Sequence, residues 1–181
     1  MATKKRSLAS APAQLRRMYI DCRYGQLHLT TAYPASGGFD EAAPIVFVHA
    51  EDGTGADFNR CAALLGTDRS VYAPDLPGNG GSDAPKGRLS IANVALAIVD
   101  LLEQLRIKRV DLVGSGRGAL VAYELAATRP QEVRRLVVAG SQQPAAPIAQ
   151  PMLQVSPDAG RIVEEPADAL AGEIRSFLDR A

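Results

Sequence analysis

The sequence predicts an α/β fold with a mostly parallel sheet, helices on both faces of that sheet and an antiparallel hairpin near the N-terminus. Residues 45–48 are wholly apolar, which is typical of a parallel strand covered on both faces. Such runs alternate with segments whose apolar residues recur at helical spacing, and this indicates strand–helix–strand units. At 110–126 a strand turns sharply into a helix, and three glycines lie within five residues of that turn.

The hairpin is predicted at 18–33, where apolar and polar residues alternate on both sides of a turn at Tyr24-Gly25-Gln26. Residues 1–15 are interpreted as a flexible basic tail and residues 16–181 as a single domain. No apolar segment follows the basic residues of the tail, so a secretory signal is not expected. A transit peptide remains an alternative to a disordered tail.

The other elements follow in chain order, each from its pattern of apolar residues and its turn residues. We expect a helix with Phe58, Cys61, Ala62 and Leu65 on its inner face, a strand at 70–73, a proline- and glycine-rich loop at 74–83, a helix capped by Ser90 with Ile91, Val94, Ile98, Leu101, Leu102 and Leu105 inward, a strand at 133–139, an irregular segment at 141–151, a last strand at 152–155 and a helix at 164–180.

Composition excludes several classes of protein. The 181 residues are 46% hydrophobic and 22% charged, with a formal net charge of +0, which argues against nucleic acid or an acidic membrane surface as a partner. No apolar run is long enough to span a bilayer. Cys22 and Cys61 have neither a metal-binding nor a redox spacing, so free thiols are expected. We therefore expect a cytoplasmic protein with no metal and no cofactor.

The glycine-dense turn fits two kinds of site. A nucleophile elbow has the pattern G-x-S-x-G, and in that register the central residue here is Gly116, which has no hydroxyl group. A dinucleotide fingerprint has the pattern G-x-G-x-x-G/A, which Gly114, Gly116 and Ala119 satisfy. The fingerprint also requires a carboxylate at the end of the next strand, and the residues there, 138–141, are Val-Ala-Gly-Ser.

The order of the motifs resembles the α/β-hydrolase superfamily. The resemblance runs from about Met18 to Gly140 and rests on I-V-F-V-H-A, Y-A-P-D-L-P-G-N-G-G-S-D, V-D-L-V-G-S-G-R-G-A-L-V-A-Y-E-L-A and V-R-R-L-V-V-A-G. It resumes at A-G-R-I-V-E-E-P-A-D-A-L. It implies a truncated hydrolase-like sheet, in which residues 141–151 replace the cap region and part of the C-terminal sheet.

Carried over residue by residue, the resemblance leaves the positions of the catalytic triad without catalytic groups. The nucleophile position falls on Gly116, and the base position falls on Arg161, which stays protonated and cannot accept a proton. The acid has no clear counterpart, although another alignment places Asp158 there. We therefore expect a protein that binds a small carbonyl or carboxylate ligand, or a protein partner, without hydrolysing it.

The resemblance places the oxyanion-hole donors on the backbone N–H groups of Ala50 and Arg117. The expected ligand-binding residues are accordingly His49, Ala50, Glu51, Gly116, Arg117 and Arg161, with no catalytic residue assigned.

Three alternatives stay open. The first is an ester or acyl hydrolase with a relocated triad built on His49 with Glu51 or Asp52, and the second is a dinucleotide-binding domain. In the third, the two arginines are solvated or paired with Glu51 or Asp52 and bind no ligand. His28 is expected to be a surface or packing residue.

The connection at 141–151 is short for a return to a parallel strand, which normally takes a dozen or more residues. The chain there either crosses as an extended arm or leaves the strand at 133–139 partly uncovered. An open edge invites pairing with another chain, so a homodimer or a partner complex is predicted.

Overall fold

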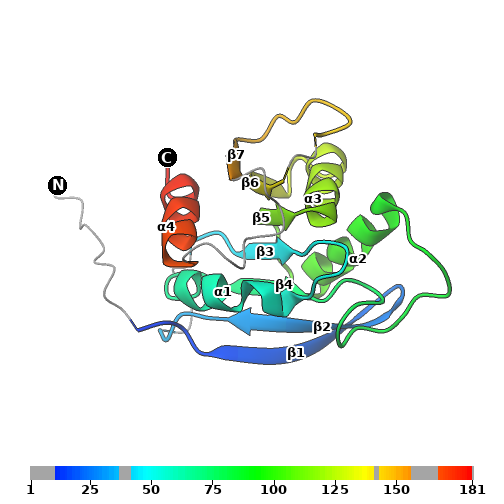
Figure 1. Cartoon of the computed structure of the whole chain (residues 1–181), viewed down its shortest axis with the longest axis horizontal. Coiled ribbons are helices and arrows are strands. Elements are labelled where there is room, and N and C mark those ends of the chain that lie inside the picture. Colours follow the sequence, from blue (N-terminus) through cyan, green and yellow to red (C-terminus); the bar gives the residue numbers. More distant parts are fainter. Residues whose placement is uncertain (1–10, 37–41, 141–142, 156–166, 181) are drawn as a thin grey trace.

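The computed structural model describes residues 11–36, 42–140, 143–155 and 167–180. Within these residues a seven-stranded sheet has the order β1-β2-β4-β3-β5-β6-β7 (Figure 1). The strands are β1 (Leu15–Cys22), β2 (Gly25–Ala32), β3 (Ile45–Val48), β4 (Val71–Pro74), β5 (Val110–Ser115), β6 (Val133–Ala139) and β7 (Met152–Val155). The helices are η1 (Gly55–Phe58), α1 (Asn59–Leu65), α2 (Ile91–Gln104), α3 (Arg117–Thr128) and α4 (Ala167–Leu178).

The predicted fold class is confirmed. The strands β1, β2 and β4 pair antiparallel, and β4, β3, β5, β6 and β7 pair parallel. The hairpin turns at Gly25, whose φ of 114° lies in a region that favours glycine. The short helix η1 was not predicted. The final helix begins at Ala167 in the structure, and the expected start at 164 lies outside the described residues.

The helices cover both faces of the sheet, as the sequence predicts, with α1 and α4 on one side and α2 and α3 on the other (Figure 1). Successive strand residues contribute to opposite cores because side chains alternate along a strand. Leu112 packs with the α2–α3 core and Val113 with the α1–α4 core, and Val46 and Phe47 divide in the same way. Each residue of β3 and β5 is buried, so the packing of these two strands holds the turn after β5 in position.

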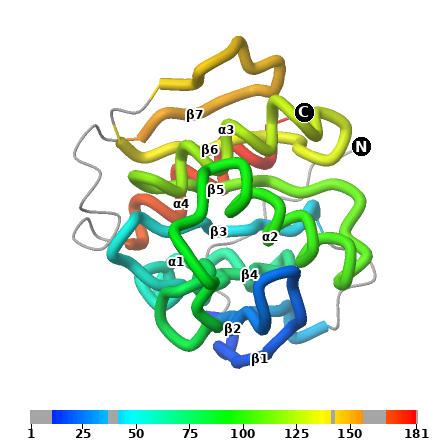
Figure 2. The backbone as a smooth tube through the Cα atoms, turned by 90° about the vertical axis from the view of Figure 1, so that its right-hand side faces the viewer, coloured from blue at the N-terminus to red at the C-terminus, as the bar shows by residue number. Residues whose placement is uncertain are grey.

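The connection from β6 to β7 crosses as an extended arm, the first of the two outcomes expected for this segment. Residues 143–151 contain neither helix nor strand, and Ile148 packs against the α2–α3 core. The Gln150 side-chain amide donates to the carbonyl of Pro130 at 3.1 Å. Because β7 pairs with β6 from Leu136 to Ala139, β6 is not an open edge. Figure 2 shows β7 at the end of the sheet opposite to the hairpin.

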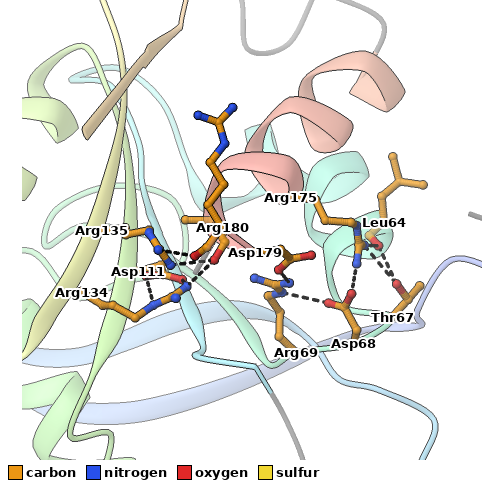
Figure 3. A network of polar contacts seen from close by, with 11 residues as sticks. Leu64, Thr67, Asp68, Arg69, Asp111, Arg134, Arg135, Arg175, Asp179 and Arg180 are labelled. Atoms are coloured by element: carbon orange, nitrogen blue, oxygen red, sulfur yellow. Dashed lines mark hydrogen bonds and ion pairs between the residues drawn. The ribbon is translucent and has the colours of Figure 1, made fainter. Parts of the chain in front are cut away.

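An arginine-rich network fixes α4 to the rest of the domain (Figure 3). Arg134 and Arg135 each donate to the carbonyl of Leu178 at 2.9 Å, which satisfies an unpaired carbonyl at the helix C-terminus. Arg134 also pairs with Asp111, a carboxylate that is 0% exposed. Burial raises the pKa of Asp111, and the adjacent Arg134 guanidinium opposes that shift.

No helix of the described part of the chain is both long and apolar enough to cross a bilayer. Cys22 and Cys61, both in that part, are free thiols. Burial raises the pKa of Cys61 to about 11, so its thiol is protonated at neutral pH.

Candidate functional site

The turn between β5 and α3 has the geometry of an elbow, with Gly116 at its tip. Gly116 has φ 51° and ψ −123°, a conformation that side-chain-bearing residues adopt only under strain. A Cβ atom on the neighbouring Gly118 would lie 2.0 Å from the carbonyl oxygen of Val48, so only glycine lets α3 pack this closely on β3. The sharp turn therefore follows from the glycines that the sequence analysis singled out.

The tip of the elbow faces Ala50, in the loop that follows β3. A Cβ atom on Gly116 would lie 3.0 Å from the Cβ of Ala50, a tight contact that a shift of a few tenths of an ångström relieves. Arg117 is the first residue of α3, and the N–H of that position has no acceptor within its own helix. Ala50, Gly116 and Arg117 line one open depression of about 660 Å³, so the structure brings together the expected backbone donors and the elbow.

His49 is held away from this depression. Its ring is 0% exposed, and Nδ1 lies 2.6 Å from the carbonyl oxygen of Ala50 while Nε2 lies 2.8 Å from the backbone nitrogen of Leu76. Nδ1 therefore carries the proton and donates a hydrogen bond to Ala50, while Nε2 accepts a hydrogen bond from the backbone N–H of Leu76. Burial lowers the pKa of His49, which keeps the ring neutral. Both ring nitrogens are bonded to backbone groups, so His49 ties two loops together, and it is not among the residues that line the depression.

Arg117 forms an ion pair with Glu51, which was one of the alternatives predicted from the sequence. Its Nη1 lies 3.0 Å from Oε1 of Glu51, and its Nη2 donates to the carbonyl of Leu89 at 2.7 Å. The Nη2 of Arg88 lies 3.0 Å from the same Glu51 oxygen. These three charged side chains also line a second cavity of about 230 Å³, whose other walls include Leu76 and Val94.

Asp75 organises the loop beside the site, although no role was predicted for it from the sequence. Its carboxylate accepts from the backbone N–H of Gly55 at 2.7 Å and of Gly81 at 2.8 Å, and it lies 2.9 Å from Nδ1 of His28. Burial alone would raise the pKa of Asp75, but the hydrogen bonds from Gly81, Gly55 and His28 hold that pKa below its ordinary value. His28 is therefore one half of a polar pair. An aspartate directly after a buried strand in a glycine-rich loop was the available signal.

Two candidate residues lie outside the described part of the chain. Arg161, the expected cation at the base position, and Asp158, the alternative acid, both fall within 156–166. Among the described residues, no group of three or more histidine, cysteine, aspartate or glutamate side chains is placed to hold a metal ion.

Comparison with known families matches residues 43–166 to the alpha/beta hydrolase fold. The chain belongs to the α/β-hydrolase family. This membership and the position of the glycine turn correct the dinucleotide alternative. The turn follows β5, although β3 is the first of the parallel strands in chain order, and β6 ends at Ala139 without a carboxylate.

Two curated relatives illustrate the similarity of this α/β-hydrolase. An uncharacterised protein of Mycobacterium tuberculosis is 38% identical over 94 residues, which are 52% of this chain and 28% of that protein. The 2-hydroxymuconate semialdehyde hydrolase of Pseudomonas sp. is 32% identical over 126 residues, which are 67% of this chain and 43% of the relative. The chain thus spans less than half of the length of either relative.

Solved structures show the same partial coverage. Epoxide hydrolase CorEH matches with a TM-score of 0.64 at 22% identity, over 70% of this chain and 42% of that protein, and it shows the fold alone. A mutant of the N-acyl homoserine lactonase AidH with a serine-to-glycine change, complexed with N-hexanoyl homoserine lactone, matches with a TM-score of 0.62 at 26% identity. That match covers 70% of this chain and 45% of the lactonase.

Proposed function

We propose that this α/β-hydrolase binds a small ligand with a carbonyl or carboxylate group above the elbow and does not hydrolyse it. The observation that carries the proposal is Gly116, which occupies the tip of the elbow at φ 51° and has no side chain to attack a substrate. The backbone around it still forms the wall of a binding site, with Ala50 and Arg117 on the same depression.

The bonding of His49 supports the same proposal. A relocated base needs an unshared ring nitrogen near the substrate, and both nitrogens of His49 are bonded to backbone groups. The lactonase structure adds support, because a mutant of that protein with a serine-to-glycine change is seen in complex with a lactone.

Hydrolysis is the competing function, and hydrolases among the curated relatives favour it. Turnover of p-nitrophenyl butyrate separates the two functions. We expect the unaltered protein to release p-nitrophenolate at the rate of buffer alone. The Gly116→Ser and Gly116→Ser/Arg161→His variants test whether a restored hydroxyl, alone or with a base, recovers turnover. Gly172→Ser is the matched control, because it adds the same side chain where nothing lies within 4 Å. Turnover by the unaltered protein above the rate of buffer would overturn the proposal, and its loss in His49→Ala would assign the activity to a relocated base at His49.

Ligand binding is measured separately with N-hexanoyl homoserine lactone. A ligand that binds the folded state raises Tm as its concentration increases. We expect such a rise for the unaltered protein, with the lactone recovered intact by mass spectrometry. A constant Tm together with a flat calorimetric titration would contradict binding of this ligand.

We also propose that the chain is cytoplasmic and forms a homodimer or a partner complex. The support for the cytoplasm is the pair of unbridged cysteines, Cys22 and Cys61, which a reducing compartment preserves. The support for association is β7, a four-residue strand that pairs on one side with β6 and ends the described sheet. A monomer in light scattering at high concentration would remove the homodimer.

A further inference from the structure

Glu51 lies between two arginines at the rim of the depression above Gly116. Its Oε1 is 3.0 Å from Nη2 of Arg88 and 3.0 Å from Nη1 of Arg117. The exposed fraction of the side chain is 84% for Arg88, 53% for Glu51 and 23% for Arg117. Exposed ion pairs are weak, so the Glu51 carboxylate can leave the arginines at a small cost in free energy and water can take its place.

Arg117 is fixed by a bond that does not depend on Glu51. Its Nη2 donates to the carbonyl of Leu89 at 2.7 Å, and its backbone begins α3. If the Glu51 carboxylate moves away, the guanidinium stays in place and Nη1 becomes available to another acceptor. Arginine is well suited to this exchange because its planar fork binds carboxylates in a defined geometry.

The cluster of Glu51, Arg88 and Arg117 lies between two hollows, since all three residues line both the open depression and the cavity of about 230 Å³. The rest of the small cavity includes the apolar side chains of Leu76, Pro77, Leu89 and Val94. A water molecule takes up about 30 Å³ of liquid, so the cavity holds roughly seven or eight groups of that size. A ligand that fits has one anionic end at Arg117 and a short apolar body.

We propose that Glu51 is an internal competitor for a carboxylate site on Arg117, and that the ligand of this site is a short aliphatic carboxylic acid whose chain enters the small cavity. The inference rests on the proposed function and deepens it, because it names a chemical class of ligand whose carboxylate lies at Arg117, which lines the depression above Gly116, and whose chain lies in the adjoining small cavity. Glu51 occupies the arginine when the ligand is absent, and the ligand's carboxylate replaces it.

Calorimetric titration with hexanoate tests the exchange, with hexanamide as the neutral analogue of the same shape. We expect hexanoate to bind the unaltered protein and hexanamide to bind at least tenfold more weakly. Glu51→Gln removes the competing charge, so hexanoate should bind about two- to fivefold tighter. This factor corresponds to the free energy that an exposed ion pair contributes. Arg117→Gln should abolish the preference for hexanoate over hexanamide.

Glu132→Gln is the matched control, because it removes a carboxylate that pairs with Arg129 at 2.9 Å at the far end of α3. Its hexanoate affinity should equal that of the unaltered protein. Circular dichroism melting of each variant verifies folding. If Arg117→Gln does not fold, the hexanoate affinity of Glu51→Gln and the comparison of hexanoate with hexanamide decide whether the inference holds.

Three results would overturn the inference: no hexanoate binding to Glu51→Gln, equal binding of hexanoate and hexanamide, or unchanged hexanoate affinity in Glu51→Gln. Hexanoate contains no bond that a hydrolase cleaves, so its binding is independent of turnover. A protein that hydrolyses esters and binds hexanoate as expected refutes the proposed function alone. A protein that neither hydrolyses esters nor binds hexanoate refutes this inference alone.

Discussion

Replacing Gly116 with alanine measures directly whether the elbow has the geometry described above. At φ 51° and ψ −123° a side-chain-bearing residue is strained by about 1–3 kcal/mol. The new Cβ also lies 3.0 Å from the Cβ of Ala50, which adds to the cost. For a chain of this size 1 kcal/mol corresponds to about 2–4 °C in Tm, so a cost of about 2 kcal/mol lowers Tm by about 4–8 °C.

Gly172→Ala is the matched control for this substitution. Gly172 lies within α4, and a Cβ atom there has nothing within 4 Å. Alanine is favoured over glycine inside a helix by roughly 0.5–1 kcal/mol, so this variant should melt at a higher temperature than the unaltered protein. Thermal unfolding followed by circular dichroism gives both values. Opposite signs are expected, and a Tm that rises or stays constant in Gly116→Ala would refute the elbow conformation.

Three further predictions concern other parts of the domain. Arg134→Met leaves the buried carboxylate of Asp111 without its partner and should lower the free energy of unfolding in urea by about 3–5 kcal/mol, whereas Arg134→Met/Asp111→Leu should recover most of the loss; equal losses would contradict the ion-pair argument. Ser90 accepts a hydrogen bond from the Asn93 N–H at 3.2 Å, so Ser90→Ala should lower Tm by about 2–4 °C, and an unchanged Tm would show that this cap contributes nothing. Burial lowers the pKa of His49 in the folded state, so the unfolded chain takes up a proton first as the pH falls. The contribution of His49 to the free energy of unfolding should therefore be fully present above pH 6.5 and should decrease below it by at most about 1.4 kcal/mol per pH unit. Urea titrations at pH 7.5 and 5.5 should show a smaller pH dependence for His49→Gln than for the unaltered protein.

The sheet could be predicted from the sequence because its signals are local. Ile45–Val48 is apolar at each position, as a strand buried on both faces must be, and the hairpin alternates around a single glycine turn. The helix η1 was missed because it is one short turn. It depends on a hydrogen bond from the Thr54 N–H to the Asp57 carboxylate, a local pairing that leaves no periodic pattern.

The candidate site could be predicted only in its backbone. The glycines placed the elbow correctly, because their spacing alone determines where the chain can turn so tightly. The positions of the side chains depend on partners that are distant in the sequence. Glu51 contacts Arg117, which is 66 residues away along the chain, and His49 contacts Leu76, which is 27 residues away. Sequence patterns report neighbours three or four residues apart, so the pairing of Arg117 with Glu51 could be proposed only as one alternative, and the contact between His49 and Leu76 was not predicted.

The residue at the tip of the elbow affects both the stability of the fold and the chemical groups available at the site. A serine at position 116 would be strained, so glycine gives the folded state a lower free energy and leaves the tip of the elbow without a hydroxyl group. Introducing a serine supplies only part of the chemistry, because its hydroxyl still needs a proton acceptor and His49 is committed to the backbone. The donors at Ala50 and Arg117 belong to the main chain and do not depend on either residue. The proposed binding at the elbow therefore does not require a nucleophile, and for this reason binding and turnover have to be measured separately.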